Sequence, residues 1–284
     1  MTRSAMKYFF FLLFLLAEGL TAQNKRFIYQ YTFIPDSTNK AGVMKEFMFL
    51  DVSDGGSSFF SQRKYQSDST MIAPANKGKM IMPPMDLQVL YTIEKKGDKI
   101  FYKTLGSSAQ MKIKVNEDRK MDWKILNDRQ KILNYDAQKA SLKFGGRTWN
   151  AWFTQAIPMQ DGPYKFHGLP GLIVKIEDTT ASHIFELVGI ANLLDDYSYP
   201  ERYQFLKEVE FNRAEYQKYY TKYRKDPAAI EKQLYIEGRI PDQRDHTGNF
   251  RTGAQVLRDI EIAAKENVKK DNNIIEIDML KTVQ

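Results

Sequence analysis

Three methionine side chains form the first cluster whose residue type and spacing could bind a metal ion. They are Met80, Met82 and Met85, in a stretch that Pro83 and Pro84 keep extended. Soft thioether ligands suit Cu(I), but methionine also fills uneven apolar gaps and coats adaptable binding surfaces. No histidine lies near them in the sequence. Copper binding is therefore the weaker alternative, and we predict no metal centre and no cofactor.

The histidines and carboxylates form no recognisable catalytic motif. His167, His183 and His246 lie far apart, and Asp242 and Asp245 are the carboxylates nearest to His246. That last group could hold a metal ion, but residues of these types are common in turns. Neither Gly-x-Ser-x-Gly nor His-Glu-x-x-His occurs in the sequence. We therefore predict no catalytic residue, with carboxylate-dependent hydrolysis as the alternative.

Short strands are the predicted elements for most of the chain. Aromatic and polar residues alternate over 27–33, which indicates a half-buried strand. Gly145 and Gly146 form the two-residue loop that a tight hairpin turn requires. Further strands are predicted at 43–52, 57–66, 87–94, 99–105, 141–144, 147–153, 172–176, 184–190, 203–211 and 274–280. Strands that recur about every ten residues indicate an antiparallel sheet.

Helices are predicted from about residue 212. Asn212 and Glu215 have the spacing of a capping box, and the four tyrosines of 216–223 fall on one helical face. Further helices are predicted over 226–238 and 254–269. The tyrosine face is typical of a helix docked on a sheet, although aromatic rings beside lysines could also stack on sugars or bases.

These elements predict an α+β fold that is mainly β. We expect a curved antiparallel sheet or partial barrel of many short strands, with C-terminal helices packed on it. We find no linker and no internal repeat, so residues 23–284 are predicted to form a single domain. That domain would be rich in strands to about residue 211 and helical over about 212–270.

The segment 161–176 contains a rigid turn that leads into a strand. In Gly168-Leu169-Pro170-Gly171-Leu172-Ile173, the proline presets the first central position of a type II turn and Gly171 supplies the positive φ of the second. Leu172, Val174 and Ile176 then continue as one face of the strand. The segment is not a phosphate-binding loop, because it lacks the glycines and the Lys-Ser/Thr pair of such loops. A structural role is predicted for this turn.

The same residues carry a resemblance to a known family. Gly168-Leu169-Pro170-Gly171-Leu172-Ile173 resembles the signature of the GLPGLI family, which consists of exported proteins of Bacteroidota-type bacteria. Other landmarks that look similar are 138–140, 144–147, 151–153, 157–158 and 162–166. The resemblance covers about residues 131–190, and Ala137 stands where relatives often have cysteine. It implies an envelope location and a mostly β fold, but no accepted activity.

Residues 1–22 have the layout of a secretory signal. Arg3 and Lys7 precede an apolar run from Tyr8 to Ala17, and Ala22 offers a small residue at the cleavage point. The run is roughly half of the 20 apolar residues that a spanning helix needs. We therefore expect cleavage, and a mature chain in the periplasm, associated with the outer membrane or secreted. The chain has no cysteine, which excludes disulfides, thiolate metal sites and a lipid on an N-terminal cysteine.

The whole chain has a net charge of +7, with 42 basic and 35 acidic residues. A basic chain is often a partner of nucleic acid, but export argues against that partner. We therefore expect another envelope protein or an apolar ligand to be the partner, and no transmembrane segment after signal cleavage. The oligomeric state is left open by the sequence.

The leading hypothesis is a non-enzymatic envelope protein that binds an apolar ligand or a partner protein. Aromatic residues are abundant, at 13% of the chain, and many lie in predicted strands. The predicted ligand or partner surface consists of Trp149, Trp152, Tyr164, Phe166 and His167, with the two tryptophans on opposite faces of one strand. The alternatives are a hydrolase of an envelope polymer and, more weakly, copper binding by the methionines.

Overall fold

The computed structural model describes residues 24–73, 77, 78, 84, 86–194, 197–245 and 247–281. The predicted secretory signal at 1–22 lies outside the described residues. So do Met80, Met82 and Met85, and so does His246.

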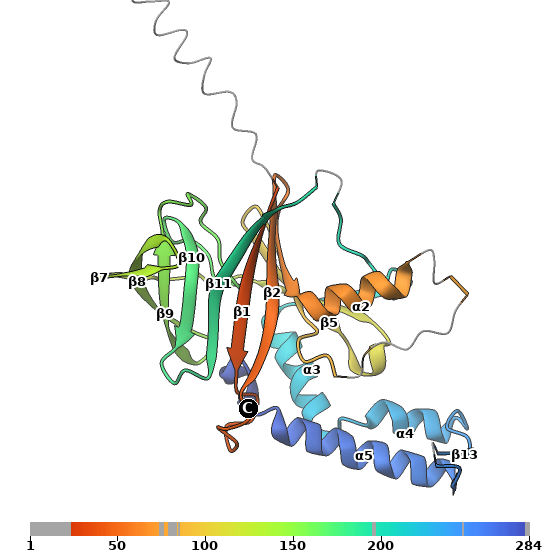
Figure 1. Ribbon diagram of the computed structural model, residues 1–284. Coiled ribbons are helices and arrows are strands. Elements are labelled where there is room, and N and C mark those ends of the chain that lie inside the picture. Colours follow the sequence, from red (N-terminus) through yellow and green to blue (C-terminus); the bar gives the residue numbers. More distant parts are fainter. Residues whose placement is uncertain are drawn as a thin grey trace, which may run out of the picture.

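A twelve-stranded, strongly bent sheet forms the body of the protein (Figure 1). The strand order is β12-β6-β5-β4-β3-β2-β1-β11-β10-β9-β8-β7. Neighbouring strands are antiparallel except β12 and β6, which are parallel, and the sheet is not closed into a barrel. The strands are β1 (Lys25–Phe33), β2 (Met44–Ser53), β3 (Gly56–Ser61), β4 (Thr92–Lys96), β5 (Lys99–Leu105), β6 (Lys112–Glu117), β7 (Lys124–Ile132), β8 (Tyr135–Phe144), β9 (Arg147–Thr154), β10 (Leu172–Asp178), β11 (His183–Asn192) and β12 (Glu208–Phe211). The predicted mainly β fold is confirmed.

Strand β1 lies between β2 and β11 and shows why these segments pair. Phe27, Tyr29, Tyr31 and Phe33 are buried on one face, because side chains alternate between the two faces of a strand. The ring of Tyr31 stacks on Phe185 of β11, with centroids 4.1 Å apart. The alternation in the sequence therefore sets which face of β1 enters the core.

The β8–β9 hairpin turns at Gly145 and Gly146, as predicted. Their φ angles are 63° and 80°, which suits a primed two-residue turn. The C-terminal segment packs directly on this turn, so a Cβ on Gly145 would lie 2.9 Å from the side chain of Glu276. Glycine is needed here both for the turn and for that close approach.

Four α-helices and two short 3-10 turns are described outside the sheet. They are α2 (Gln62–Ile72), η3 (Ser107–Ala109), α3 (Arg213–Lys225), α4 (Ala229–Ile236), α5 (Gly253–Lys270) and η4 (Ile277–Leu280), and β13 (Gln243–Arg244) pairs with β14 (Phe250–Arg251). The capping box of Asn212 and Glu215 begins α3 as predicted. Helices α4 and α5 lie side by side and extend away from the sheet (Figure 1). No helix of the described residues is long and apolar enough to cross a membrane.

Several predicted strands have other boundaries or another conformation. The strand predicted at 57–66 ends at Ser61, whose hydroxyl accepts from the backbone N–H of Lys64 and caps α2. The strands predicted at 87–94 and 203–211 form only over Thr92–Lys96 and Glu208–Phe211. The prediction of a strand at 274–280 was wrong: the second half of this segment is the 3-10 turn η4. There the apolar residues pack on α3 and the β8–β9 turn rather than on a neighbouring strand.

Candidate functional site

A cavity of about 680 Å³ lies between the sheet and the C-terminal helices. Strands β1, β5, β6 and β11 form one wall, and helices α3 and α5 with residues 271–276 form the other. This volume is within the range of about 300–1,000 Å³ that is typical of small-molecule sites. Among the described residues it is the best candidate for a functional site.

Eight tyrosines line this cavity. Four come from one face of α3, because positions three and four apart on a helix are neighbours, and four come from the sheet side. They are Tyr31, Tyr91, Tyr102, Tyr164, Tyr216, Tyr219, Tyr220 and Tyr223. The rings of Tyr102 on the sheet and Tyr216 on α3 are in contact, with centroids 5.7 Å apart. The predicted tyrosine face of α3 is therefore turned toward the sheet, and the cavity lies beside this contact.

The phenols around the cavity are neutral near pH 7. Burial raises the pKa of Tyr220 to about 12 and raises the pKa of Tyr216 well above its usual value. Neutral phenols can donate or accept hydrogen bonds, and their rings provide apolar surface. The lining is suited to a ligand with an apolar body and few polar groups.

A buried ion-pair network forms part of the cavity lining. Lys165 Nζ lies 2.8 Å from Glu117 Oε2 and 2.5 Å from Glu276 Oε1. The Tyr164 hydroxyl donates to Glu276 at 2.7 Å, and Arg119 pairs with both carboxylates. Burial alone would raise the pKa of Glu276, but the charges of Lys165 and Arg119 outweigh it and hold that pKa at about 2. The network is thus charged but internally neutralised.

His183 forms a second buried polar cluster at the cavity wall. Its Nε2 lies 2.7 Å from the carbonyl oxygen of Asn273, and its Nδ1 lies 2.7 Å from the Tyr31 hydroxyl. Nε2 therefore carries the proton and donates, while Nδ1 accepts from the tyrosine. Burial and the nearby Arg147 lower the pKa of His183 to about 4. The imidazole is neutral near pH 7, and its two nitrogens are occupied by protein partners.

Two residues of the predicted contact surface belong to the core instead. Trp149 and Phe166 are both 0% exposed, with ring centroids 4.8 Å apart. Phe166 belongs to the segment 163–168. This segment folds over the sheet and brings the Phe166 ring onto Trp149 of β9. These two aromatic side chains contribute apolar packing and cannot contact a partner.

The other three residues of that predicted surface lie in different places. Tyr164 is buried but lines the cavity. Trp152 is half-buried on the opposite face from Trp149, under the ammonium group of Lys139 at 5.7 Å from the ring centroid. His167 is half-buried, and its Nδ1 lies 2.9 Å from the Lys165 carbonyl. The structure therefore brings only Tyr164 to the cavity.

The turn at 168–173 is part of the structural framework beside the cavity. Leu169, Leu172 and Ile173 are buried, and the Tyr29 hydroxyl donates to the Ile173 carbonyl at 2.7 Å. The turn differs from the predicted type II geometry: the N–H of Gly171 bonds to the carbonyl of Leu169 at 2.7 Å, while the N–H of Leu172 bonds to Ile157. A Cβ on Gly171 would lie 2.1 Å from the Thr154 carbonyl oxygen, so close backbone contact requires glycine there.

No pattern in the sequence indicated the ion-pair network. Glu117, Arg119, Lys165 and Glu276 come from β6, its following loop, the 163–168 segment and the C-terminal segment. Their spacing follows no motif. The tyrosine face of α3 was the available signal for the cavity, since it predicted an aromatic surface turned toward the sheet.

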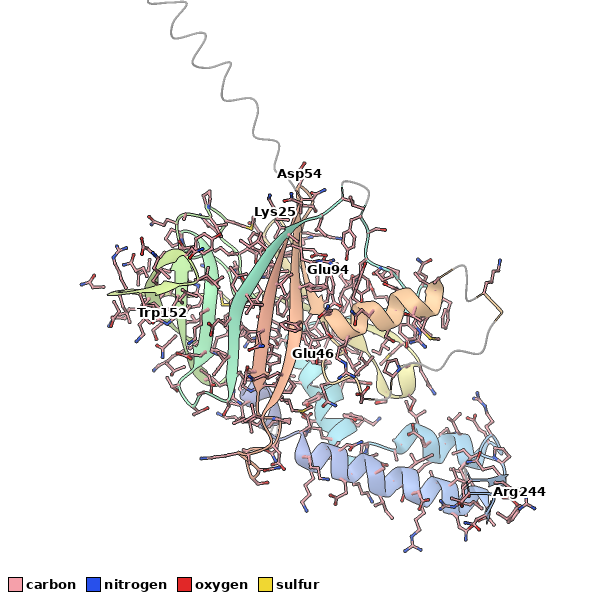
Figure 2. The ribbon with its side chains drawn as sticks, in the orientation of Figure 1. Lys25, Glu46, Asp54, Glu94, Trp152 and Arg244 are labelled. Atoms are coloured by element: carbon pink, nitrogen blue, oxygen red, sulfur yellow. The ribbon has the colours of Figure 1, made fainter. Side chains whose placement is uncertain are left out.

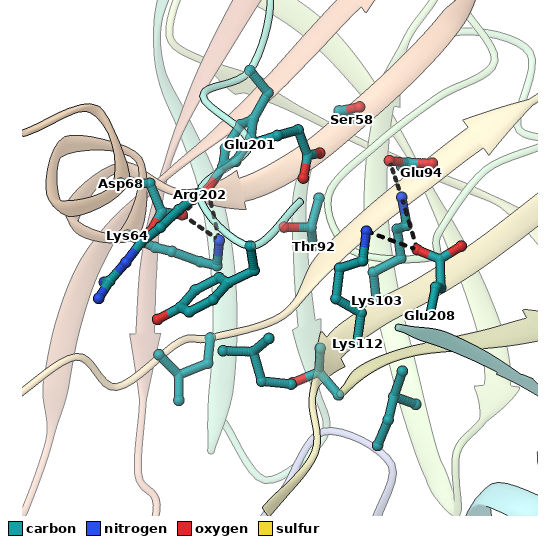
Figure 3. Close-up of a pocket in the computed structure, with 16 residues that line it drawn as sticks. Ser58, Lys64, Asp68, Thr92, Glu94, Lys103, Lys112, Glu201, Arg202 and Glu208 are labelled. Carbon is teal, nitrogen blue, oxygen red and sulfur yellow. Dashed lines mark hydrogen bonds and ion pairs between the residues drawn. The ribbon is translucent and has the colours of Figure 1, made fainter. Parts of the chain in front are cut away.

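A second, smaller pocket of about 90 Å³ lies between α2, β4–β6 and the segment before β12 (Figure 3). It is lined largely by charged side chains that pair with one another. Lys64 lies 2.6 Å from Asp68, and Lys103 lies 2.7 Å from Glu94. Glu201 and Arg202 also line the pocket and form no ion pair within the described part of the chain. The volume of about 90 Å³ is nevertheless well below the range typical of small-molecule sites, so the larger cavity is the better candidate.

The described residues contain no group of three or more histidine, aspartate or glutamate side chains placed to hold a metal ion. Asp242 is exposed and Asp245 is half-buried in the arm beyond α4, which contains Arg244 (Figure 2). Asp245 accepts from Thr247 and Asn249, and Asp242 accepts from the N–H of Gly253 at the start of α5. Both carboxylates serve turn and cap geometry.

A β-rich fold with a tyrosine-lined cavity is the class that these features define. Residues 144–175, from the β8–β9 turn into β10, match a family model described as a protein of unknown function (Porph_ging). No curated protein matches the chain at a significant level.

Two solved structures of PNGF-II match part of this chain. The structure in space group C2 matches with 17% identity and a TM-score of 0.50, over 72% of this chain and 34% of PNGF-II. The structure in space group P21 matches with 16% identity and a TM-score of 0.49, over 69% and 33%. The matched part is about a third of PNGF-II, and at this identity the likeness concerns the fold alone.

Proposed function

We propose that this chain is an exported, non-enzymatic protein of the cell envelope that binds an apolar ligand in the tyrosine-lined cavity. The observation that carries the proposal is the cavity itself, at about 680 Å³. A sheet face packed only for stability would be filled by side chains. Here a space large enough for a ligand remains between the sheet and α3, walled by rings that provide apolar area.

Ligand binding accounts for the cavity better than protein docking does. The lining residues belong to an inward-facing space between two walls, whereas a docking surface would be exposed on the outside. Trp149 and Phe166, which we predicted to be part of a contact surface, are buried. Partner binding at another face remains the alternative.

The state of Glu117 and Glu276, two of the four described carboxylates in the cavity lining, supports a binding role over hydrolysis. A third, Asp271, has a raised pKa but lies 3.4 Å from Arg224. A glycosidic general acid needs a raised pKa, but the pKa values of Glu117 and Glu276 are both lowered. Burial opposes that shift, and the hydrogen bonds and charges of Arg119 and Lys165 outweigh it. We therefore propose that these two carboxylates hold the fold together rather than transfer protons.

Export and family membership are part of the same proposal. The apolar run within residues 1–22 supports a cleaved signal, and the resemblance at Gly168–Ile173 supports membership of the GLPGLI family. The match at 144–175 covers the same hairpin and turn.

Expression in a Gram-negative host with cell fractionation tests the proposed export: the mature protein should begin at Gln23 and leave the cytoplasm. A full-length chain retained in the cytoplasm would contradict it.

A cavity-filling variant tests ligand binding. Ala264 lines the cavity from α5, so Ala264→Trp should occupy space that the ligand needs. Ile262 lies on the same helix, does not line the cavity and is 54% exposed, so Ile262→Trp is the matched control.

The probe is N-phenyl-1-naphthylamine, a neutral apolar dye whose fluorescence rises in apolar surroundings. The wild type and Ile262→Trp should bind it saturably with one site, and Ala264→Trp should weaken binding at least tenfold while its circular dichroism is unchanged. Equal binding by all three proteins would contradict the proposal, as would the absence of saturable binding by the wild type.

A further inference from the structure

The charged residues that line the cavity are unequal in sign. Four are carboxylates and two are cations, and they are Glu117, Glu231, Asp271, Glu276, Lys165 and Arg213. Most of these charges are compensated by neighbours. The sign of any uncompensated charge decides which ligand charge the cavity favours, because Coulomb energies grow as water is excluded.

The ion-pair network in the lining leaves no net charge for a ligand. Lys165 and Arg119 compensate Glu117 and Glu276, and Arg213 lies 2.7 Å from Asp278. Arg213 Nε and Asp278 Oδ1 are each buried without a hydrogen-bond partner, so this pair offers one spare donor and one spare acceptor. This part of the lining favours neither sign of ligand charge.

Asp271 is also compensated. It lies 3.4 Å from Arg224 Nη1. Burial raises the pKa of Asp271, with the charge of Arg224 opposing that shift. Its carboxyl group therefore adds little free negative charge.

Glu231, in the first turn of α4, is the exception. Its Oε1 accepts from the Ser108 hydroxyl, and its Oε2 is buried without a hydrogen-bond partner. Within the described part of the chain it forms no ion pair, since the neighbouring Lys232 pairs with Asp226 and Glu261 instead. A carboxylate oxygen shielded from water without a partner is costly, and a cationic ligand group would relieve that cost.

The hydroxyl of Tyr219 on α3 is held near this carboxylate. The backbone N–H of Ser107 donates to the Tyr219 hydroxyl at 2.9 Å, and the hydroxyl of the adjacent Ser108 donates to Glu231. Burial is the main cause of the raised pKa of Tyr223; the charge of Asp271 adds to it, and the charge of Glu231 adds a smaller part. Aromatic faces combined with a carboxylate attract ammonium groups, including quaternary ones.

We infer that the ligand of this cavity carries a positively charged group, such as an ammonium, on its apolar body, and that this group binds between Glu231 and the rings of Tyr219 and Tyr223. The inference rests on the proposed function and adds the chemical class of the ligand. The apolar body lies along the tyrosine walls.

Three probes with one alkyl chain and different head groups test this inference. They are octyltrimethylammonium, 1-octanol and octyl sulfate, measured by isothermal titration calorimetry below their micelle concentrations. The wild type should bind octyltrimethylammonium about tenfold more tightly than 1-octanol, which corresponds to one partly shielded charge interaction, and octyl sulfate most weakly. The preference should shrink as salt concentration rises.

Glu231→Gln removes the charge and keeps the shape. It should bring octyltrimethylammonium and 1-octanol to within about twofold of each other, while 1-octanol binds as it does to the wild type. The matched control is Glu237→Gln at the other end of α4, where the side chain lies outside the cavity; it should leave the tenfold preference intact.

The outcomes separate the two proposals. If 1-octanol binds but the ammonium probe shows no preference, or if the preference survives in Glu231→Gln, the cationic ligand is overturned and the apolar cavity stands. If the wild type binds none of the three probes, and N-phenyl-1-naphthylamine also fails to bind, both proposals fall. Preference for octyl sulfate would show that the cavity selects the opposite charge.

Discussion

Lys165 and Glu276 are 111 residues apart in the chain, yet Nζ of one lies 2.5 Å from Oε1 of the other in a buried ion pair. Lys165 precedes the 168–173 turn, and Glu276 lies in the segment that packs on the β8–β9 turn. Their contact therefore joins the sheet to the C-terminal part of the chain. Both residues also line the cavity, so the stability of this pair and the shape of the site are linked.

Removal of Lys165 should destabilise the protein strongly. In Lys165→Met, Glu117 and Glu276 lose a buried counter-charge, and breaking one side of such a network costs about 3–5 kcal/mol. Urea unfolding followed by circular dichroism measures the change in unfolding free energy. Lys96→Met is the control, because Lys96 is exposed at 64% and pairs only loosely; its change should be within about 0.5 kcal/mol. A loss below about 1 kcal/mol in Lys165→Met would contradict the role of this pair.

Glu276 should make the folded state sensitive to strong acid. Its pKa is about 2 in the folded protein against a usual 4.5, so its stabilising contribution is present above pH 4.5 and is lost as pH falls toward 2. The shift corresponds to about 3 kcal/mol. The unfolding free energy of the wild type should fall over that range, and Glu276→Gln should show a flatter profile. Equal slopes for the two proteins would contradict the low pKa.

The contribution of His183 to stability should be lost in a different pH range, closer to neutral than that of Glu276. Its pKa is about 4 in the folded protein against a usual 6.5, so folding favours the neutral ring. Its contribution is complete above pH 6.5 and declines as pH falls toward 4, by about 3 kcal/mol in total. Unfolding measured at pH 7 and pH 5 should show this decline in the wild type. His183→Gln should show less of it, whatever its stability at pH 7; an undiminished decline would count against the buried neutral imidazole.

The capping signal of α3 could be predicted from the sequence because it is local. Asn212 and Glu215 contact each other within one helical turn, and the two glycines of the β8–β9 turn fix a conformation over two residues. The prediction of a strand at 274–280 was wrong for the opposite reason. Its alternating apolar residues fit a strand, but tertiary contacts with α3 and the Gly145–Gly146 turn decide its conformation.

Gly171 should tolerate no side chain. Its φ is 147°, and a Cβ would lie 2.1 Å from the Thr154 carbonyl oxygen, so Gly171→Ala must displace the backbone of the turn from β9. We expect a loss of about 3 kcal/mol or more in unfolding free energy. Gly168 has φ of 87° with open space around it. Gly168→Ala should therefore cost only about 1 kcal/mol, and similar losses for both would contradict the close-contact explanation.

The cavity itself could not be predicted from the sequence. Its lining combines tyrosines from one helix face with side chains from four strands and a C-terminal segment. No local pattern shows that the sheet and α3 stand far enough apart to leave a space between them. Burial also reverses the expected role of Trp149 and Phe166, since aromatic residues in strands pack in the core as readily as they bind partners.

Native mass spectrometry of the mature protein from its own cell envelope tests the central claim most directly. The wild type should carry a bound small molecule with one-to-one stoichiometry, removable by organic extraction, and Ile262→Trp should carry the same mass. Ala264→Trp, purified in parallel, should lack it. A wild-type protein that is free of ligand, or a mass that is retained equally in Ala264→Trp, would contradict ligand binding in this cavity.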